Sequence, residues 1–340
     1  MLNEVSAQAL PGGRGVPPAA LLDGLWQPGA PHRAALRDGD RALTAGELAA
    51  RVDAFSEALT ALRPRALGIA LDNGIDWIVA DLAAMRAQIP VAPLPGFFSA
   101  AQAASVIEAA GLDALVAPDA AGAARFGFTL EVGGSPGSAG LFTRRGAPRP
   151  ALPAGTAKIT FTSGTTGQPK GVCLSTEQQF AVAASLVEAT SGLALERHLC
   201  LLPLPVLLEN IAGVYAPLDA GAEVVVPPLE SVGMAGAARL DVARMVGAIA
   251  RFAPHSVILV PQMLKAWVYA LRQGAPLPPD LRFVAVGGGK VAADLLRQAR
   301  ELGLPAYEGY GLSECASVVS LNRPGADKPG TVGRVLPHLR

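Results

Sequence analysis

Short apolar runs alternate with longer amphipathic stretches along almost the whole chain. Apolar positions at helical spacing predict helices at residues 44–62, 77–88, 100–110, 176–190, 238–252, 262–273 and 292–302. The clearest runs of strand length separate or flank these helices, at residues 66–71, 114–117, 159–162, 199–202, 223–226, 257–260 and 283–286. Such alternation is typical of βαβ units with right-handed crossovers. We therefore expect an α/β fold with doubly wound, largely parallel sheets flanked by helices.

One segment interrupts this alternation. Residues 133–155 are rich in Gly, Pro and Ser and include the basic residues Arg144, Arg145 and Arg149. This composition predicts a long connection between two lobes, with its charges in a solvated loop rather than in a binding patch. We expect residues 1–150 to form a first lobe with an N-terminal arm, and residues 151–340 to form a second.

Composition excludes several classes of protein. The 340 residues include 28 basic and 28 acidic side chains, and 51% of the chain is hydrophobic. This balance argues against a disordered chain and against a globally basic nucleic-acid binder. The mean hydropathy is +0.36, yet no uninterrupted apolar run approaches the roughly 20 residues that span a bilayer. Without a recognisable signal peptide, a cytoplasmic location is expected.

The cysteines and histidines favour structural roles. Cys173, Cys200 and Cys315 are far apart and include no CxxC pair, which predicts reduced and mostly buried thiols. His198 and His255 each stand at the start of an apolar run. With four histidines and no HxxxH spacing, a histidine metal site is not expected.

The most informative segment is Ser163-Gly164-Thr165-Thr166-Gly167-Gln168-Pro169-Lys170-Gly171, which follows an apolar run. Glycines let backbone N–H groups approach an anion, hydroxyls donate further hydrogen bonds and the lysine adds positive charge, so polyphosphate is the natural ligand. The segment differs from the P-loop pattern GxxxxGK[ST], in which the lysine directly follows the second glycine. A tight hairpin without a ligand is the alternative. Lys170 is one of only five lysines in the chain, which favours phosphate.

This nine-residue segment resembles the nucleotide loop of the acyl-adenylating superfamily. That superfamily comprises acyl- and aryl-coenzyme A synthetases, luciferases and the adenylation domains of peptide synthetases. The resemblance extends from about Leu36 to the chain end, through four further segments in the family's order. It implies a catalytic role for Lys170 and nucleotide binding by Thr162, Ser163, Gly164, Thr165, Thr166, Gly167 and Lys170.

The second segment begins Leu202-Pro-Leu-Pro-Val-Leu-Leu-Glu209. It is similar to the Leu-Pro-Leu-Ser-His-x-x-Glu stretch of long-chain fatty acyl synthetases, in which a helix beside the acid site follows a buried strand. Val206 stands where the histidine is customary, so the pocket wall should be more apolar. For Glu209, a place beside the acid site and a surface position at a helix end both stay open.

The third segment is Gly287-Gly288-Gly289-Lys290, which follows an apolar run. It matches the glycine segment that passes the adenine and the acyl chain in this family, so the resemblance implies nucleotide contacts for Gly287, Gly288 and Gly289. Glycine is needed where a backbone lies flat against a ligand. Strand-to-helix turns in other α/β folds also read Gly-Gly, and Lys290 is interpreted as a solvent-exposed lysine.

The fourth segment runs from Tyr307 to Glu314 and includes Tyr310-Gly311-Leu312-Ser313. The resemblance implies that Tyr310 stacks on adenine, that Ser313 hydrogen-bonds the α-phosphate and that Glu314 holds Mg²⁺ as a catalytic metal ligand. Gly311 is counted with the nucleotide-binding residues. The chemistry agrees, because an aromatic face suits a purine and a hard carboxylate suits Mg²⁺.

The fifth segment, residues 328–340, is similar to a Gly-x-Val-Gly-x-Pro stretch that enters a third subdomain in relatives. In complete relatives an aspartate that binds ribose follows, and then a small C-terminal domain with a catalytic lysine. The resemblance therefore implies that this chain holds the first two lobes, without the third β subdomain and the small C-terminal domain.

The implied function is activation of a small carboxylic acid by ATP. The acid would form an acyl-adenylate with release of pyrophosphate, and coenzyme A would then take the acyl group, with Mg²⁺ assisting. We expect the 340-residue chain alone to bind ATP weakly and to adenylate poorly. Leucines around Val206 favour a fatty acid, and an aryl acid is the runner-up. A non-catalytic nucleotide-binding module and a scaffold without nucleotide affinity are further alternatives, and the oligomeric state is left open.

Overall fold

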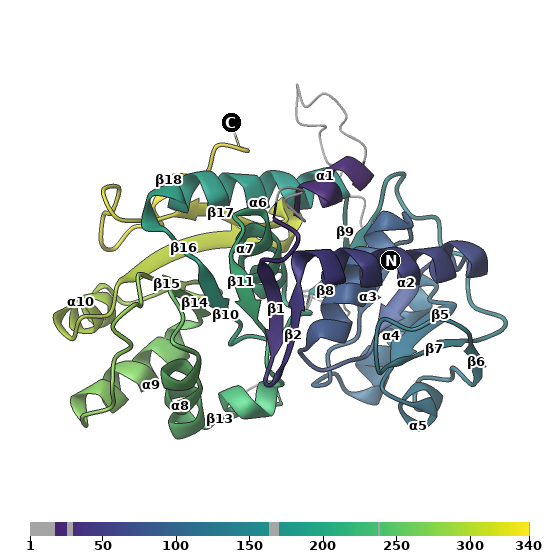
Figure 1. Cartoon of the computed structure of the whole chain (residues 1–340), viewed down its shortest axis with the longest axis horizontal. Helices are drawn as coiled ribbons and strands as arrows, with labels where there is room; N and C mark the ends of the chain where they lie inside the picture. Colours follow the sequence, from purple (N-terminus) through teal and green to yellow (C-terminus); the bar gives the residue numbers. More distant parts are fainter. Residues whose placement is uncertain (1–17, 26–29, 163–169, 237–238, 340) are drawn as a thin grey trace. The chain divides into compact units, whose positions relative to one another are not determined.

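The computed structural model describes residues 18–25, 30–162, 170–236 and 239–339 (Figure 1). The chain divides into two compact units, one of residues 1–32 with 44–179 and one of residues 33–43 with 180–340. This division differs from the one the sequence predicts after residue 150. The reason is that strands β8 (Lys158–Thr162) and β9 (Lys170–Leu174) belong to the sheet of the first unit.

The first unit contains a seven-stranded sheet in the order β6-β7-β5-β3-β4-β8-β9. Its remaining strands are β3 (Leu67–Ile69), β4 (Val91–Pro93), β5 (Ala114–Ala117), β6 (Leu130–Val132) and β7 (Gly140–Thr143). Strands β5, β3, β4 and β8 are parallel, whereas β6, β7 and β9 are antiparallel to their neighbours. Strand β7 lies within the segment that the sequence predicts as a connection. A strand forms there because Leu141 and Phe142 are apolar and are buried in the core.

The helices of the first unit are α1 (Pro18–Leu25), α2 (Ala45–Leu62), α3 (Ile75–Arg86), α4 (Ala100–Ala110) and α5 (Ala120–Ala124). Local sequence fixes several helix ends. Helix α4 starts with a capping box between Ser99 and Gln102 and stops at Gly111, which has a left-handed backbone conformation (φ 64°). Helices α2 and α3 pack together. Buried residues of α4 and α5 form a separate core with the strands.

The second unit contains a nine-stranded sheet in the order β18-β17-β16-β15-β14-β10-β11-β1-β2. Its strands are β1 (Ala34–Asp38), β2 (Arg41–Thr44), β10 (Arg197–Leu199), β11 (Glu223–Val225), β14 (Ser256–Leu259), β15 (Phe283–Val286), β16 (Ala306–Leu312), β17 (Ser317–Leu321) and β18 (Arg334–Val335). Strands β1, β11, β10, β14, β15 and β16 run parallel, and β17 and β18 add antiparallel strands at one edge. A separate two-stranded sheet pairs β12 (Met234–Ala235) with β13 (Arg239–Leu240).

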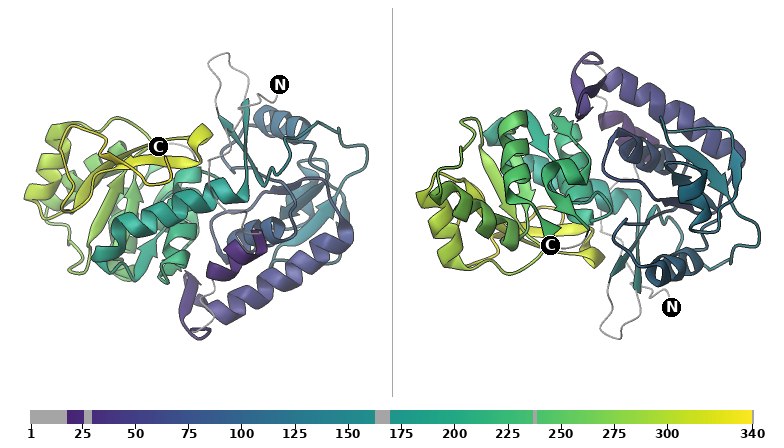
Figure 2. Two further views of the ribbon diagram at one scale, coloured as in Figure 1. Left: turned by 90° about the horizontal axis from the view of Figure 1, so that it is seen from above. Right: turned by 90° about the horizontal axis from the view of Figure 1, so that it is seen from below.

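Helices cover both faces of this sheet (Figures 1 and 2). They are α6 (Thr176–Thr190), the π-helix η2 (Leu208–Tyr215), α7 (Ala216–Asp219), α8 (Val242–Phe252), α9 (Pro261–Arg272) and α10 (Ala293–Glu301), with short 3₁₀ turns η1 (Ser191–Leu193), η3 (Leu229–Val232) and η4 (Ser313–Cys315). Side chains alternate between the faces of a strand. On β14 and β15, Val257, Leu259, Val284 and Val286 are buried in one core with residues of α8, α9 and α10, and Ile258 joins the same core.

The α/β fold with two helix-flanked sheets is confirmed. Each of the seven predicted strands and seven predicted helices has a counterpart of the same type, with shifted ends. The helix predicted from residue 238, for example, begins at Val242 because the side chain of Asp241 accepts a hydrogen bond from the N–H of Arg244. Among the helices in the described residues, none has both the length and the apolar composition that a membrane span requires.

Candidate functional site

The two ends of the predicted phosphate loop are adjacent strands of the first unit. Thr162 is the last residue of β8 and Lys170 is the first residue of β9, and the two are register partners in an antiparallel pair. Both side chains are half-buried. Ser163, Gly164, Thr165, Thr166 and Gly167 lie outside the described residues. The pairing holds the hydroxyl of Thr162 and the ammonium group of Lys170 at the same end of the hairpin.

The predicted adenine and Mg²⁺ motif occupies β16 and the short turn η4 that follows it in the second unit. Tyr310 is 44% exposed, so its ring has a face available to a ligand. A Cβ at Gly311 would clash with the backbone carbonyl of Ser317, and this close approach explains the glycine. Glu314 is exposed in η4, where a carboxylate suits a hydrated Mg²⁺ ion.

The glycine segment follows β15 directly. Gly287 is buried, while Gly288 and Gly289 are exposed. Gly288 has a φ of 76°, which favours glycine. Lys290 is exposed, as its interpretation as a solvent-exposed lysine requires.

These two motifs meet at one cavity of about 220 Å³ within the second unit. They lie together because β15 and β16 are parallel neighbours in which Val286 pairs with Glu308. The predicted site residues that line the cavity are Gly287, Gly288, Tyr310, Gly311 and Ser313. Gly289 and Glu314 are not among its lining residues. The structure therefore brings five of the sequence-predicted nucleotide residues of this unit together at one cavity.

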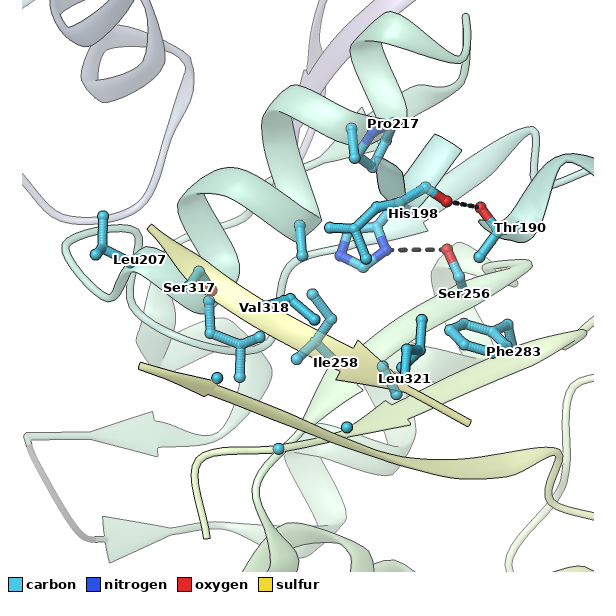
Figure 3. A pocket seen from close by; sticks show the side chains of 18 of the residues that line it. Thr190, His198, Leu207, Pro217, Ser256, Ile258, Phe283, Ser317, Val318 and Leu321 are labelled. Carbon is cyan, nitrogen blue, oxygen red and sulfur yellow. Dashed lines mark hydrogen bonds between the residues drawn. The ribbon is translucent and has the colours of Figure 1, made fainter. Parts of the chain in front are cut away.

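The cavity continues from these motifs along one face of the sheet (Figure 3). Residues of β14 and β15 form the sheet side, namely Val257, Ile258, Phe283, Ala285 and Val286. The other walls are mainly apolar side chains from α6, η2, α7 and β17, namely Leu186, Val187, Leu207, Leu208, Ala212, Ala216, Pro217, Val318 and Leu321. Val206 also lines the cavity, so the position of the customary histidine contributes an apolar wall, as predicted.

A polar pair lies at the end of the cavity remote from the glycine segment. His198 and Ser256 are register partners on β10 and β14, and Ser256 is the register partner of Phe283 on β15. Nδ1 of His198 lies 2.9 Å from Oγ of Ser256 (Figure 3). Both residues are buried and both line the cavity. Sequence reasoning assigned His198 a structural role and did not single out Ser256. The alternation along the two strands could have indicated that both face away from the core.

Glu209 is fully buried beneath this pair. One carboxylate oxygen accepts the N–H of Leu202 at 2.9 Å, and the other lies 3.1 Å from Nε2 of His198. The surface position that the sequence left open for Glu209 is therefore wrong. The residue belongs to η2, a π-helix, and such turns are frequent at functional sites. The result is a buried chain of hydrogen bonds from Glu209 through His198 to Ser256.

Cys200 completes the polar cluster. Burial raises the pKa of its thiol well above the ordinary value, and the charge of Glu209 and a hydrogen bond with it act in the same direction. The ligand atoms of His198, Cys200 and Glu209 lie within 4.8 Å of one another, a spacing that could suit a metal. Because the carboxylate already has hydrogen-bond partners in Leu202 and His198, we interpret the cluster as a hydrogen-bonded network. Of the other two cysteines, Cys173 and Cys315 are half-buried and free.

The sequence is similar to one family model and to several characterised proteins. A family model described as "AMP-binding enzyme" matches residues 26–340. A 2-succinylbenzoate-CoA ligase of Bacillus pumilus is 28% identical over 183 residues, which are 53% of this chain and 35% of that protein. A fatty acid-[acyl-carrier-protein] ligase of Mycobacterium marinum is 28% identical over 337 residues, which are 91% of this chain and 61% of that protein. The chain thus spans less than two thirds of the length of either relative.

The fold also resembles solved structures. One is an O-succinylbenzoate coenzyme A synthetase from Bacillus subtilis in complex with AMP, with a TM-score of 0.73 and 23% identity. The match covers 93% of this chain and 80% of that one. At this identity the likeness supports the fold.

Proposed function

The chain belongs to the AMP-binding enzyme family, and on this basis we propose that it is the nucleotide- and acid-binding part of an ATP-dependent acid-CoA ligase. In the first step a carboxylate oxygen of the acid attacks the α-phosphorus of ATP, giving an acyl-adenylate and pyrophosphate. In the second step the thiol of coenzyme A attacks the acyl carbon and AMP leaves. The observation that carries the proposal is the cavity, which joins the Gly287 and Tyr310 motifs to an apolar pocket.

The nucleotide roles follow the motifs residue by residue. We propose that Tyr310 stacks on adenine, that Ser313 hydrogen-bonds the α-phosphate, and that the triphosphate is bound by the loop residues Thr162, Ser163, Gly164, Thr165, Thr166, Gly167 and Lys170. The ammonium group of Lys170 would neutralise charge on the phosphates. Glu314 is the proposed Mg²⁺ ligand, and bound Mg²⁺ would neutralise charge on the phosphates.

For the acid, we propose an aryl acid rather than a fatty acid. The relatives include 2-succinylbenzoate-CoA ligases, which act on an aromatic acid by name. The cavity supports a ring, because Ala212, Ala216 and Ala220 contribute small side chains to one of its walls. A fatty acid is the second candidate. It is supported by the apolar lining and by the fatty acid-[acyl-carrier-protein] ligase among the relatives.

The proposal is tested by nucleotide binding and by acid-dependent exchange of labelled pyrophosphate into ATP. We expect ATP with Mg²⁺ to raise the melting temperature of the chain, and Lys170→Met or Glu314→Gln to reduce that rise. Lys265→Met is the matched control, because Lys265 is an exposed lysine on α9. We expect slow exchange that is faster with aryl acids than with aliphatic or amino acids.

The other outcomes separate the alternatives. ATP-dependent stabilisation without exchange for any acid, even after a relative's C-terminal part is fused to the chain, would indicate a non-catalytic nucleotide-binding module. No stabilisation by ATP would indicate a scaffold. Exchange that is fastest with fatty acids would reverse the proposed order of the two acid classes.

A further inference from the structure

We propose that the activated acid carries a hydrogen-bond donor, such as a hydroxyl, at the end remote from its carboxylate, and that Ser256 accepts this hydrogen bond. The inference rests on the proposed acid-activating function and narrows its substrate class. It comes from the buried pair of His198 and Ser256, which lies at the end of a mainly apolar cavity remote from Gly287.

The direction of the hydrogen bonds determines what Ser256 offers. A carboxylate only accepts hydrogen bonds, so the 3.1 Å contact between Glu209 and Nε2 of His198 assigns a proton to Nε2. We assign His198 the neutral imidazole, in which Nδ1 is the acceptor, so that the hydroxyl of Ser256 donates to it across 2.9 Å. Ser256 has no second proton to give. Its remaining lone pairs make it an acceptor for a ligand that donates.

A second hydroxyl at this end of the cavity belongs to Thr190, which is only half-buried, whereas Ser256 is buried. Thr190 donates its proton to the carbonyl of Leu186 at 2.8 Å, as Figure 3 shows. Nearby lining side chains, such as Phe283, Leu321 and Pro217, offer no hydrogen-bonding side-chain group. A ligand hydroxyl placed against them would be buried without a partner, which is unfavourable. Ser256 is therefore the buried hydroxyl at this end of the cavity that can accept a hydrogen bond from a ligand.

The distance along the sheet sets the size of the acid. Ser256 is level with Phe283, the first residue of β15, whereas Gly287 follows the last residue of that strand. Four residue steps at about 3.3 Å each give roughly 13 Å along the strand direction. With its carboxylate near Gly287, an aromatic acid with a short side chain and a hydroxyl opposite that chain would reach Ser256 within this limit.

The test measures acid binding to the intact chain by calorimetry, using matched pairs that differ by one hydroxyl. The aromatic pair is 4-hydroxycinnamate and cinnamate, and the aliphatic pair is 8-hydroxyoctanoate and octanoate. We expect the hydroxylated member of at least one pair to bind about tenfold more tightly. Ser256→Ala should remove this preference, so that the two members of each pair bind with equal affinity. Ser191→Ala, which alters an exposed serine near the end of α6, should keep it.

A second variant guards against a failure to fold. Ser256→Cys retains a side chain of similar size but is a weaker acceptor, so it should reduce the preference while circular dichroism remains that of the wild type. Equal affinity for both members of each pair, or a preference that survives Ser256→Ala, would overturn the inference.

The same titrations separate this inference from the proposed function. If acids bind and support pyrophosphate exchange without a hydroxyl preference, only the inference fails. If no acid binds and ATP does not stabilise the chain, the proposed function fails and the inference falls with it. The pair with the larger preference identifies the aromatic or aliphatic class.

Discussion

Gly213 lies directly against Glu209 inside the π-helix η2. A Cβ at residue 213 would clash with Oε1 of Glu209 and lie 2.9 Å from Nε2 of His198. The hydrogen bond between those two side chains thus occupies the space that any other residue at position 213 would need. The absence of a side chain at Gly213 is therefore needed for the hydrogen bond between Glu209 and His198.

Replacing Gly213 should therefore destabilise the protein. We expect Gly213→Ala to lower the free energy of unfolding by about 1–3 kcal/mol, because the buried carboxylate must move away from a partner. Urea denaturation followed by circular dichroism measures this loss. The control is Gly247→Ala in α8, where a Cβ would meet open space. That change should stabilise the protein by up to about 1 kcal/mol. Equal tolerance at the two glycines would contradict this requirement for Gly213.

The thiol of Cys200 should be inert in the folded protein. Burial raises its pKa, Glu209 raises it further, and its side chain is enclosed, so thiolate is scarce and inaccessible. We expect alkylation by iodoacetamide at neutral pH to be slower than at half-buried Cys315 by about two orders of magnitude. Peptide mapping by mass spectrometry measures each site. In urea the three cysteines should react alike, and rapid labelling of Cys200 in the native protein would contradict the buried network.

The ion pairs of Glu223 should make the free energy of unfolding depend on pH. Its carboxylate accepts from Arg37 and Arg197 on both neighbouring strands, at 2.8 Å each. Burial alone would raise its pKa, but these arginines outweigh burial and hold the pKa below 4.5. The stabilisation is therefore present above about pH 4.5 and is lost as the pH falls through the lower pKa of the folded state. We expect Glu223→Gln to lower the free energy of unfolding by about 1 kcal/mol at pH 7. The loss should become progressively smaller as the pH falls.

Denaturation at several pH values measures the effect of Glu223→Gln. The matched control is Glu230→Gln, which removes an exposed ion pair with Arg244 and should change stability little. If Glu223→Gln lowers the free energy of unfolding by the same amount down to pH 3, the loss comes from altered packing rather than from the missing charge.

The buried ion pair of the first unit should be sensitive to the loss of one partner. Nζ of Lys158 lies 2.9 Å from Asp81, and both side chains are at most 2% exposed. Burial lowers the pKa of Lys158, and the charge of Asp81 and its hydrogen bond oppose this effect. We expect Asp81→Asn to cost about 3–5 kcal/mol, because the ammonium group would remain buried without its counter-charge.

A double replacement distinguishes charge from packing at this pair. Asp81→Leu combined with Lys158→Met should recover most of the stability that Asp81→Asn loses. Asp294→Asn, in an exposed pair with Arg297, should alter the unfolding free energy by less than about 1 kcal/mol. If the double variant is as unstable as Asp81→Asn, the pair is required for packing instead.

Much of the fold could be predicted because its signals are local. The helix at residues 100–110 has its capping box and its terminal glycine in the adjoining sequence. The runs at 257–260 and 283–286 are apolar because parallel strands covered on both faces bury both sets of side chains. The family resemblance also placed Gly287 and Tyr310 at the same nucleotide, and in the structure Gly287 follows β15 while Tyr310 lies on its neighbour β16.

Other elements depend on partners far away in the chain. Strand β7 lies in a segment rich in Gly, Pro and Ser, and it forms because it pairs with β5 and β6. Glu209 looked equally suited to a surface, and its burial depends on the donors of His198 and Leu202. Local preference is weak in such segments, so tertiary contacts decide their structure.

The sequence by itself determined the class of fold, the order of its elements and the motifs expected to hold nucleotide, because these are written in short-range patterns of residues. Only the tertiary structure decided that those motifs open onto an apolar cavity with His198 and Ser256 at its far end. The two residues are 58 positions apart and become partners through the register of parallel strands β10 and β14. Register is fixed by the packing of the whole sheet, and no short segment of sequence contains that information.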